Sequence, residues 1–320
     1  MSDIMSVLTT LFHILVFPGL LFVCVIGLLL AGIDRKVLAH MQKRVGPPIL
    51  QPVYDFFKLM GKETIIPEEA NPFVYKAAPL VGFASLVVMA LFIPVFGYSA
   101  FGGNADLIVI LYLLTIPAVA LIVGGSASGS PFAGIGISRE MVTMMSYELP
   151  LVLVLLAVAK KVGGGALCFS LQDITLWQQT QGCGIAHWSL IPAAIAMLLV
   201  IPAEVGTQPF DVAEAETEIC EGPLVEYSGA PLAMFKLNTA MKMFIMTSLF
   251  TCLFLGGINT GIVVLNALIL VAICIVLTVL CMTLIHAVTA RLKIEHLFKF
   301  YWTFVTGLAA VSLVLVWFGL

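Results

Sequence analysis

Residues 204–226 concentrate acidic side chains in a pattern that could hold and pass protons or small cations. The segment carries seven carboxylates and no Lys or Arg. If it is helical, spacings of 3, 4 and 3 place one set of acids on a single face, between breakers at Pro209 and Gly222-Pro223. That set is Asp211, Glu214, Glu218 and Glu221. Like charges so placed repel, and partial burial raises a carboxyl pKa towards the range where protons exchange at neutral pH. The alternative is an acidic loop that binds water or a basic partner.

Further acids extend this pattern towards the membrane. Glu204 ends one apolar run, Glu148 stands at the mouth of another, and Glu140 follows Arg139 two turns earlier. Ionisable groups at membrane depth are costly and usually mark ion paths. We therefore predict a file of carboxylates that enters the bilayer from the cytoplasmic side. Its members are Glu140, Glu148, Glu204, Asp211, Glu214, Glu216, Glu218, Glu221 and Glu226.

A second charged segment, residues 34–76, has the features of a docking surface. Gly46-Pro47-Pro48 predicts a rigid break, because proline restricts its predecessor and donates no backbone hydrogen bond. After the break, apolar residues at helical spacing predict an amphipathic helix at the interface or against a partner; they are Val53, Phe56, Phe57 and Met60. Seven cations stand against five acids, a near-balance that favours salt-bridged structure over a lipid-binding basic patch. The alternative is a solvated loop.

Other chemistry finds no support in the sequence. None of the seven cysteines forms a C-x-x-C motif, so we expect no iron–sulfur cluster, haem or structural zinc in this chain. Cys168 and Cys183 share a loop and could pair, with only their proximity in support. The five histidines include no H-x-x-x-H or H-E-x-x-H spacing, and there is no G-x-S-x-G motif. The chain has no evident site for redox or nucleophilic chemistry of its own.

The composition requires that these residues be positioned by membrane helices. Of 320 residues, 61% are hydrophobic and 10% are charged, and the mean hydropathy is +1.12. So few charges exclude a soluble domain, a disordered chain, a coiled coil and a nucleic-acid binder. Long unbroken apolar runs exclude a transmembrane barrel, whose strands alternate. We predict an all-α, polytopic protein with residues 1–320 as a single integral membrane domain.

Apolar runs interrupted by Gly, Pro and charge predict about eight transmembrane helices. The first is long enough to cross with some tilt, and we expect no cleaved signal peptide, since no basic segment precedes it. The predicted spans are 11–33, 77–96, 107–123, 147–159 with a start reaching back into 138–146, 188–202, 241–256, 262–286 and 301–320.

The distribution of Lys and Arg predicts the orientation. The loops after the first, third, fifth and seventh spans hold thirteen of the fifteen cations, and the other side holds only Lys160 and Lys161. Cytoplasmic loops carry the excess of Lys and Arg. Both termini should therefore face outward, with long cytoplasmic loops at 34–76 and 203–240.

Specific motifs in the charged segments match a known family in the same order. The first group is Asp34-Arg35-Lys36, Met41-Gln42-x-Arg44-x-Gly46-Pro47, Leu50-Gln51-Pro52, Asp55, Lys58-Leu59, Lys62-Glu63 and Ile66-Pro67. The second group is Arg139, Ser146-Tyr147-Glu148, Ala203-Glu204, Pro209-Phe210-Asp211, Glu214-Ala215-Glu216, Glu218, Val225 to Gly229, and Arg291. From about residue 30 to 300, the sequence resembles the membrane subunit shared by respiratory complex I and the energy-converting membrane-bound [NiFe] hydrogenases.

The resemblance implies a multi-pass subunit of the cell membrane that joins a cytoplasmic arm to antiporter-like membrane subunits. Its carboxylates would couple electron transfer to H⁺ or Na⁺ movement. The expected cytoplasmic partners are the hydrogenase large and small subunits and an iron–sulfur subunit, which would hold the [NiFe] centre and the [4Fe-4S] clusters, with no cofactor in this chain and no nucleic acid. Residues that match the family's arm-docking loop, with the last cytoplasmic loop, are Asp34, Arg35, Arg44, Asp55, Lys58, Lys62, Glu63 and Arg291.

Two departures from the family pattern favour the hydrogenase branch. Quinone-reducing members look longer between Gly-Pro and Leu-Gln-Pro, where this chain has only Pro48 and Ile49. They also carry an Asn-Arg pair after Ala-Glu-Thr, where this chain continues from Ala203-Glu204-Val205 with Gly206 and Thr207. The alternatives are a quinone-chamber subunit of a complex I-like dehydrogenase and a stand-alone secondary transporter. The latter commonly has internal repeats, and segment 204–226 has no second copy. The transported ion and the electron donor stay open.

Overall fold

The fold is a bundle of long helices. The computed structural model describes residues 10–94, 106–164 and 166–319. Eight of its helices are long and apolar enough to cross a membrane, which confirms the predicted all-α polytopic fold. Within the described ranges, the β pairing consists of one isolated bridge between Asp106 and Ser170. The spans are Thr10–Met41, Pro72–Phe92, Leu107–Ala127, Pro131–Gly163, Trp188–Val205, Gly229–Phe254, Val263–Val288 and Ile294–Trp317.

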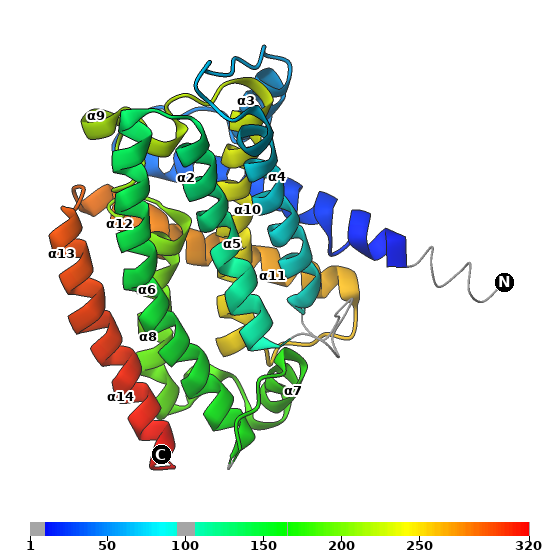
Figure 1. Cartoon of the computed structure of the whole chain (residues 1–320). Coiled ribbons are helices and arrows are strands. Elements are labelled where there is room, and N and C mark those ends of the chain that lie inside the picture. The colour runs from blue at the N-terminus through cyan, green and yellow to red at the C-terminus, as the bar shows by residue number, and fades with distance from the viewer. Residues whose placement is uncertain (1–9, 95–105, 165, 320) are drawn as a thin grey trace.

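Figure 1 shows how the elements are arranged along the chain. The first span contains α2, and the last two contain π-helical turns that join shorter α-helices. The elements used below are α2 (Leu20–Met41), α3 (Gln51–Met60), α4 (Pro72–Phe92), α5 (Leu107–Ala127), α6 (Pro131–Gly163), α7 (Leu171–Gln181), α8 (Ile191–Val205), α9 (Glu216–Ile219), α10 (Gly229–Phe254), α11 (Val263–Thr278), α12 (Leu284–Val288), α13 (Ile294–Lys299) and α14 (Thr306–Trp317).

Four predicted spans began too late, because charged residues that seemed to precede them lie inside the helices. The second span starts at Pro72, so Lys76 belongs to α4. The fourth span starts at Pro131, so Glu148 lies midway along α6 and not at its mouth. The sixth starts at Gly229, so Lys236 and Lys242 belong to α10 and not to a loop. The eighth starts at Ile294. The two long loops that we predicted to be cytoplasmic are correspondingly shorter than predicted, at 42–71 and 206–228. Residues 95–96 and 320, at the ends of two predicted spans, lie outside the described residues.

The helix α10 forms the centre of the molecule. In the most apolar 18-residue stretch of this span, 94% of the residues are buried within the protein, whereas in the first span the share is 28%. It packs against α2, α4, α8 and α11. Contact with α2 is close because Gly27 has no side chain: a Cβ there would lie 2.6 Å from the carbonyl oxygen of Ala240. In Figure 1, α2 and α11 cross behind the more upright α5, α6 and α14.

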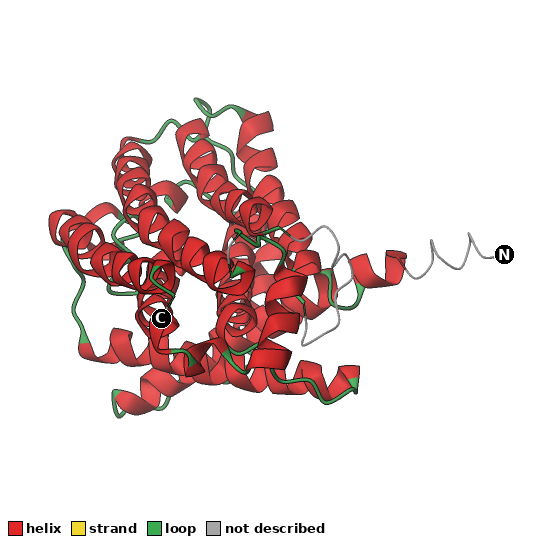
Figure 2. Cartoon of the chain, turned by 90° about the horizontal axis from the view of Figure 1, so that it is seen from below, coloured by secondary structure: helices red, strands yellow, loops and turns green. Residues whose placement is uncertain are grey.

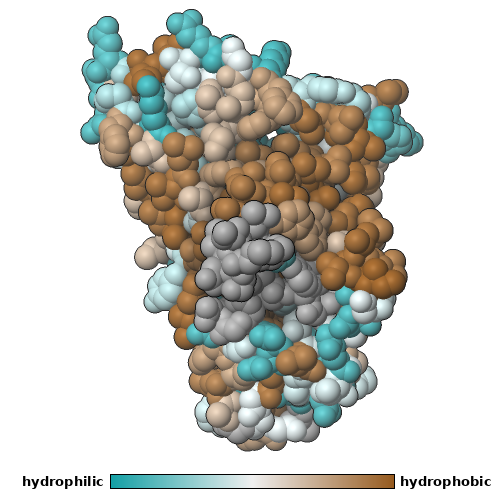
Figure 3. All heavy atoms as spheres, turned by 90° about the vertical axis from the view of Figure 1, so that its right-hand side faces the viewer, coloured by the Kyte–Doolittle hydropathy of each residue, from teal (hydrophilic) through white to brown (hydrophobic). Residues whose placement is uncertain are grey.

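Short connecting helices lie at the two ends of the bundle (Figure 1). The helices α3 and α9 lie at one end, and α7 and the C-terminal end of α14 lie at the other (Figure 1). The helices α6, α8 and α14 contact one another. The view from below shows helices joined by loops (Figure 2). The side view shows hydrophobic residues between two hydrophilic ends (Figure 3). This arrangement fits a bilayer around the middle of the bundle; which end faces the cytoplasm stays a prediction.

The amphipathic helix predicted after Gly46-Pro47-Pro48 is confirmed as α3. It begins with a proline in its first turn, where the missing donor costs no helical hydrogen bond. Phe56 packs against the core, whereas Tyr54, Phe57 and Met60 are exposed. The helix contacts α2 and α10, so it covers the end of the central pair.

Candidate functional site

The acidic connection, residues 206–228, is not the helix that the spacing of its acids predicted. The helix α8 ends at Val205, and Gly206 follows in the left-handed conformation. The helix α9 has only four residues, and Cys220 and Glu221 after it both have positive φ. The prediction that one helical face carries Asp211, Glu214, Glu218 and Glu221 is therefore wrong. Gly206 and Pro209 interrupt the helical path, and the segment folds back over the ends of the spans instead.

Four of the predicted acids meet at a small cavity inside the bundle, which we call the inner cavity. Its volume is about 60 Å³. Glu140 comes from α6, Glu204 from α8, and Asp211 and Glu214 from the acidic connection. The chain thus brings acids from three separate segments to one place.

A lysine neutralises the deepest of these acids. Lys242 of α10 places its Nζ 2.8 Å from Oε1 of Glu204, and the two side chains are 9% and 2% exposed. The buried hydroxyl of Tyr147 also donates a hydrogen bond to Glu204. Nearby, Asn238 gives its amide hydrogens to the carbonyl of Pro79, while its buried Oδ1 has no partner among the described residues. From the sequence, Lys242 was counted as a loop cation and was not predicted as a residue of the site. The signal that could have identified it is that it is the only Lys or Arg in the apolar run 237–254.

A larger polar cavity lies on the other side of the acidic connection, and we call it the entrance cavity. Its volume is about 330 Å³. Asp211 and Glu214 line this cavity as well as the inner one. Its wall also includes Asp34, Glu216, Glu221 and Arg291. The two shared carboxyls therefore form the boundary between the cavities.

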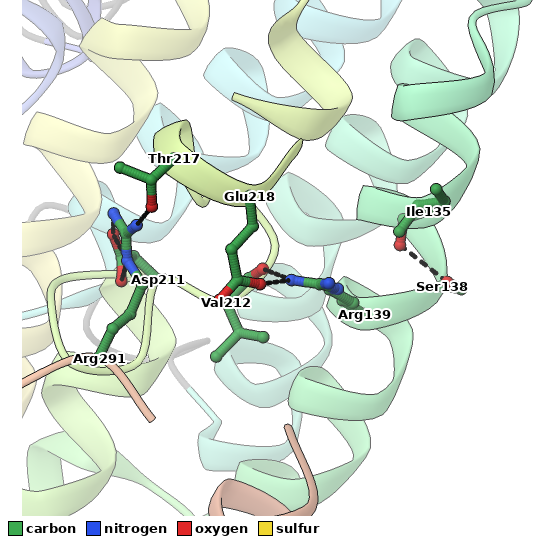
Figure 4. A network of polar contacts seen from close by, with 8 residues as sticks. All are labelled: Ile135, Ser138, Arg139, Asp211, Val212, Thr217, Glu218 and Arg291. Atoms are coloured by element: carbon green, nitrogen blue, oxygen red, sulfur yellow. Dashed lines mark hydrogen bonds and ion pairs between the residues drawn. The ribbon is translucent and has the colours of Figure 1, made fainter. Parts of the chain in front are cut away.

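Two arginines from distant segments hold the acidic connection in place, as Figure 4 shows. Arg291 donates from Nε and Nη2 to both carboxylate oxygens of Asp211, at 2.9 and 2.7 Å, and from Nη1 to the hydroxyl of Thr217. Arg139 donates to Glu218 at 2.6 Å and to the carbonyl of Val212 at 3.3 Å. Bidentate pairing of Arg291 fixes both the position and the orientation of Asp211.

Two of the glutamates in this connection, Glu214 and Glu218, have opposite electrostatic environments. Burial, followed by the charges of Glu140, Glu221 and Asp211, raises the pKa of Glu214 to about 7, although Lys242 opposes the shift. The hydrogen bond from Arg139, with its charge, lowers the pKa of Glu218. At neutral pH, Glu214 can therefore exchange a proton, whereas Glu218 stays ionised.

We expect the raised pKa of Glu214 to make stability depend on pH. The folded state binds the proton more tightly than the unfolded chain, whose pKa is near 4.5. This contribution is fully present below pH 4.5 and is lost as the pH rises through about 7. Thermal unfolding of the purified complex at pH 5 and pH 8 should differ less in Glu214→Gln than in the parent protein. An equal difference in both would contradict the raised pKa.

The other predicted acids lie outside the inner cavity. Glu216 and Glu221 line the entrance cavity. Glu148 is partly buried on α6 and lines neither cavity, although its charge interacts with that of Glu204. Glu218 and Glu226 are exposed and line neither cavity. The structure thus separates the predicted file into a buried group and a solvent-facing group.

The residues predicted to dock an arm fall into several environments. Arg35 of α2 lies 3.4 Å from Asp55 of α3. Asp34 accepts a hydrogen bond of 2.5 Å from the hydroxyl of Thr283, in a π-helical turn. Arg44 bonds the side chain of Gln42, and Glu63 is exposed. Arg291 belongs with the acidic connection, as described above.

A third cavity, of about 270 Å³, lies between α2, α3 and α10, and we call it the cationic cavity. Arg35, Lys58, Lys62 and Lys236 line it together with Asp55. Its apolar wall includes Leu28, Phe56 and Leu237.

The segment 65–75 is hydrogen-bonded to the end of the acidic connection. The hydroxyl of Ser228 accepts from the amide of Ile65 at 2.9 Å and lies 3.3 Å from its carbonyl oxygen, to which it donates. The hydroxyl of Tyr75 donates to the carbonyl of Glu226 at 2.7 Å. Tyr75 and Tyr227 stack with ring centroids 4.1 Å apart. These contacts join residues more than 150 positions apart in the sequence.

The cysteines and metal-ligand side chains add no further site. Cys168 and Cys183 are both free thiols in the structure. In the part of the chain that the structure describes, no three His, Cys, Asp or Glu side chains are grouped to hold a metal ion.

Comparisons with known proteins place this geometry in context. A family model described as NADH dehydrogenase matches residues 13–317. Hydrogenase-4 component C of Escherichia coli is 37% identical over 229 residues, 71% of this chain and 70% of that protein. An NADH-quinone oxidoreductase subunit of Thermomicrobium roseum is 38% identical over 250 residues, 71% of this chain and 72% of that protein. A chain of the membrane-bound sulfane sulfur reductase, an archaeal respiratory membrane complex, superposes with a TM-score of 0.85 at 31% identity, over 92% of this chain and 96% of that chain.

Proposed function

Because this chain belongs to the NADH dehydrogenase family, we propose that it conducts ions as the membrane anchor of an energy-converting [NiFe] hydrogenase complex. It is a membrane subunit of the complex I-like or hydrogenase-type respiratory complexes. In the proposed role, electron transfer in an attached cytoplasmic arm drives H⁺ or Na⁺ through the subunit in the cell membrane.

One observation carries the proposal: two cavities meet at shared carboxyls. Ions from the entrance cavity reach Asp211 and Glu214, which also face the inner cavity with Glu140 and Glu204. Glu214 has a pKa of about 7, so it can take up and release a proton at physiological pH. A chain of exchangeable groups from a polar mouth to a buried pair is what stepwise ion transfer into a membrane requires.

The chemistry of electrons belongs, in this proposal, to partner subunits. The hydrogenase large and small subunits and an iron–sulfur subunit would hold the [NiFe] centre and the [4Fe-4S] clusters. They would dock on the end of the bundle that carries α3 and the acidic connection. Antiporter-like membrane subunits would take the ions onward. Relatives are named as subunits of larger complexes, which supports a membrane assembly of this kind.

The sequence departures at Pro48-Ile49 and Gly206-Thr207 support the hydrogenase branch over the quinone branch. The geometry nevertheless offers an observation in favour of a quinone-chamber subunit. The cationic cavity has an apolar wall between α2, α3 and α10 that could receive a hydrophobic tail. This second candidate is also consistent with the similarity to the NADH-quinone oxidoreductase subunit.

Activity of the purified complex separates the two branches. We expect hydrogen evolution from reduced ferredoxin and no reduction of a short-chain quinone. Quinone reduction that is blocked by a rotenone- or piericidin-type inhibitor would overturn the hydrogenase assignment and establish the quinone-chamber role. The two reactions are measured on the same preparation, so loss of the arm during purification would abolish both and is recognised at once.

A further inference from the structure

Lys242 is a feature that a file of carboxylates does not by itself require. It sits on α10, the most buried span, with its ammonium 2.8 Å from Oε1 of Glu204. A charged lysine in a membrane span is costly unless it is paired, and this one is paired with the deepest acid of the proposed path. Lys236, one and a half turns earlier on the same helix, is exposed to the entrance and cationic cavities instead.

The charges around the inner cavity are matched within the chain. Asp211 is held by Arg291, and Glu204 is held by Lys242. Glu140 and Glu214 are the remaining carboxyls in the wall. Each of these two can become neutral by taking a proton, as the position of Glu214 between the cavities allows. No additional cation is needed to balance Glu204, because the chain supplies one.

A sodium ion would meet the ammonium of Lys242 directly. To bind Glu204, the sodium ion would have to lie about 4 Å from Nζ. At this separation and an effective dielectric constant of about 20, repulsion between two unit charges lowers the affinity for sodium by roughly a thousandfold. A proton avoids this repulsion, since it arrives on a carboxyl group or along hydrogen-bonded water and neutralises a charge. The polar wall suits such transfer: Thr143, Thr239 and the unpartnered Oδ1 of Asn238 face the same cavity. With about 60 Å³, the cavity has room for roughly four water molecules.

We infer that Lys242 determines the ion specificity of the inner cavity: its tethered ammonium takes the place of a metal cation, so the cavity passes protons and rejects sodium. This inference rests on the proposed function, for which it names the transported ion. Lys242 acts through Glu204 and is a positioning residue.

Carbodiimide labelling tests the inference without any ion flux. Dicyclohexylcarbodiimide reacts with protonated buried carboxyl groups, and a bound sodium ion displaces the proton and protects them. The purified complex is labelled in choline chloride or in sodium chloride at equal ionic strength, and Glu204, Glu140 and Glu214 are read by peptide mass spectrometry. We expect sodium to leave labelling of the parent protein unchanged and to reduce it about tenfold or more in Lys242→Met, where the repulsion is gone.

Two matched variants complete the test. Lys242→Arg keeps the charge and should label like the parent protein, and Lys236→Met removes a lysine from the same helix and should do so too. If Lys242→Met fails to assemble, Lys242→Gln also removes the charge and allows the same comparison of labelling with and without sodium. Protection of the parent protein by sodium would overturn the inference, and so would labelling of Lys242→Met or Lys242→Gln that sodium does not alter.

The result of the labelling experiment does not depend on whether the proposed function is correct. Labelling reports occupancy of the cavity, so a subunit that conducts no ions would still show the predicted sodium response. Conversely, sodium protection in the parent protein would leave an ion path in place and change only the ion that it carries.

Discussion

Replacement of Glu214 by Gln is expected to abolish most ion translocation while the complex still assembles and transfers electrons. Glu214 is shared by the entrance and inner cavities, and it has a pKa of about 7. The other shared acid, Asp211, is held by two hydrogen bonds from Arg291. A glutamine fills nearly the same space but cannot carry a proton. A positioned proton-transfer group typically contributes 10²–10⁴ in rate, so we expect a loss of at least about tenfold.

The measurement is ion movement per electron in proteoliposomes that contain the complete complex. Glu218→Gln is the matched control, because Glu218 lies in the same connection but is exposed, paired with Arg139 and absent from both cavities. We expect it to retain translocation near the parent value. Full translocation in Glu214→Gln, or an equal loss in both variants, would contradict a path through the shared carboxyls.

Arg291→Ala is expected to have the largest effect on the structure of the acidic connection. Arg291 makes a bidentate pair with Asp211 and also donates to Thr217. Both partners in the pair are largely buried, with side-chain exposures of 21% and 12%. Removal of the arginine leaves the carboxylate partly desolvated without a partner, a loss of about 2–3 kcal/mol. Arg291→Lys should recover part of it, since an ammonium cannot reproduce the fork of two parallel hydrogen bonds.

Limited proteolysis of the membrane-embedded protein measures this effect, because the connection 206–228 becomes cleavable when its anchor is lost. A double-mutant cycle with Asp211→Asn should give a coupling energy close to the effect of either single change. Arg139→Ala is the control: its partner Glu218 is exposed, and such pairs contribute about 0–1 kcal/mol. Equal protease sensitivity in the Arg291 and Arg139 variants would show that burial of the Asp211 pair is unimportant.

The sequence was sufficient for the class of fold because apolar runs of about 20 residues have few alternatives to membrane helices. It failed at boundaries where charge lies inside a helix. Lys242 and Glu140 have the charge that is typical of a loop, but Lys242 is buried against Glu204 of α8, and Glu140 lines a cavity with groups from other helices. A single sequence contains no record of that pairing. The fourth span, with 33 residues, is about 50 Å long, so its first turns reach beyond a hydrocarbon core of about 30 Å.

The acids of the site were identified from their types, whereas their arrangement was not. Helical spacing placed Glu214 and Glu218 together, but the chain turns between them, and one faces a cavity while the other faces solvent. The cations that decide these environments come from residues 139, 242 and 291. Because pairing across such distances depends on the packing of whole helices, local spacing carried no information about it.

The contacts of Ser228 and Tyr75 have a mechanical consequence. Ile65 and Tyr75 cannot both move away from residues 226–228 without breaking three hydrogen bonds and separating two stacked rings. Any displacement of segment 65–75 is therefore expected to carry residues 226–228 with it, at the end of the stretch that holds Glu214 and Glu221.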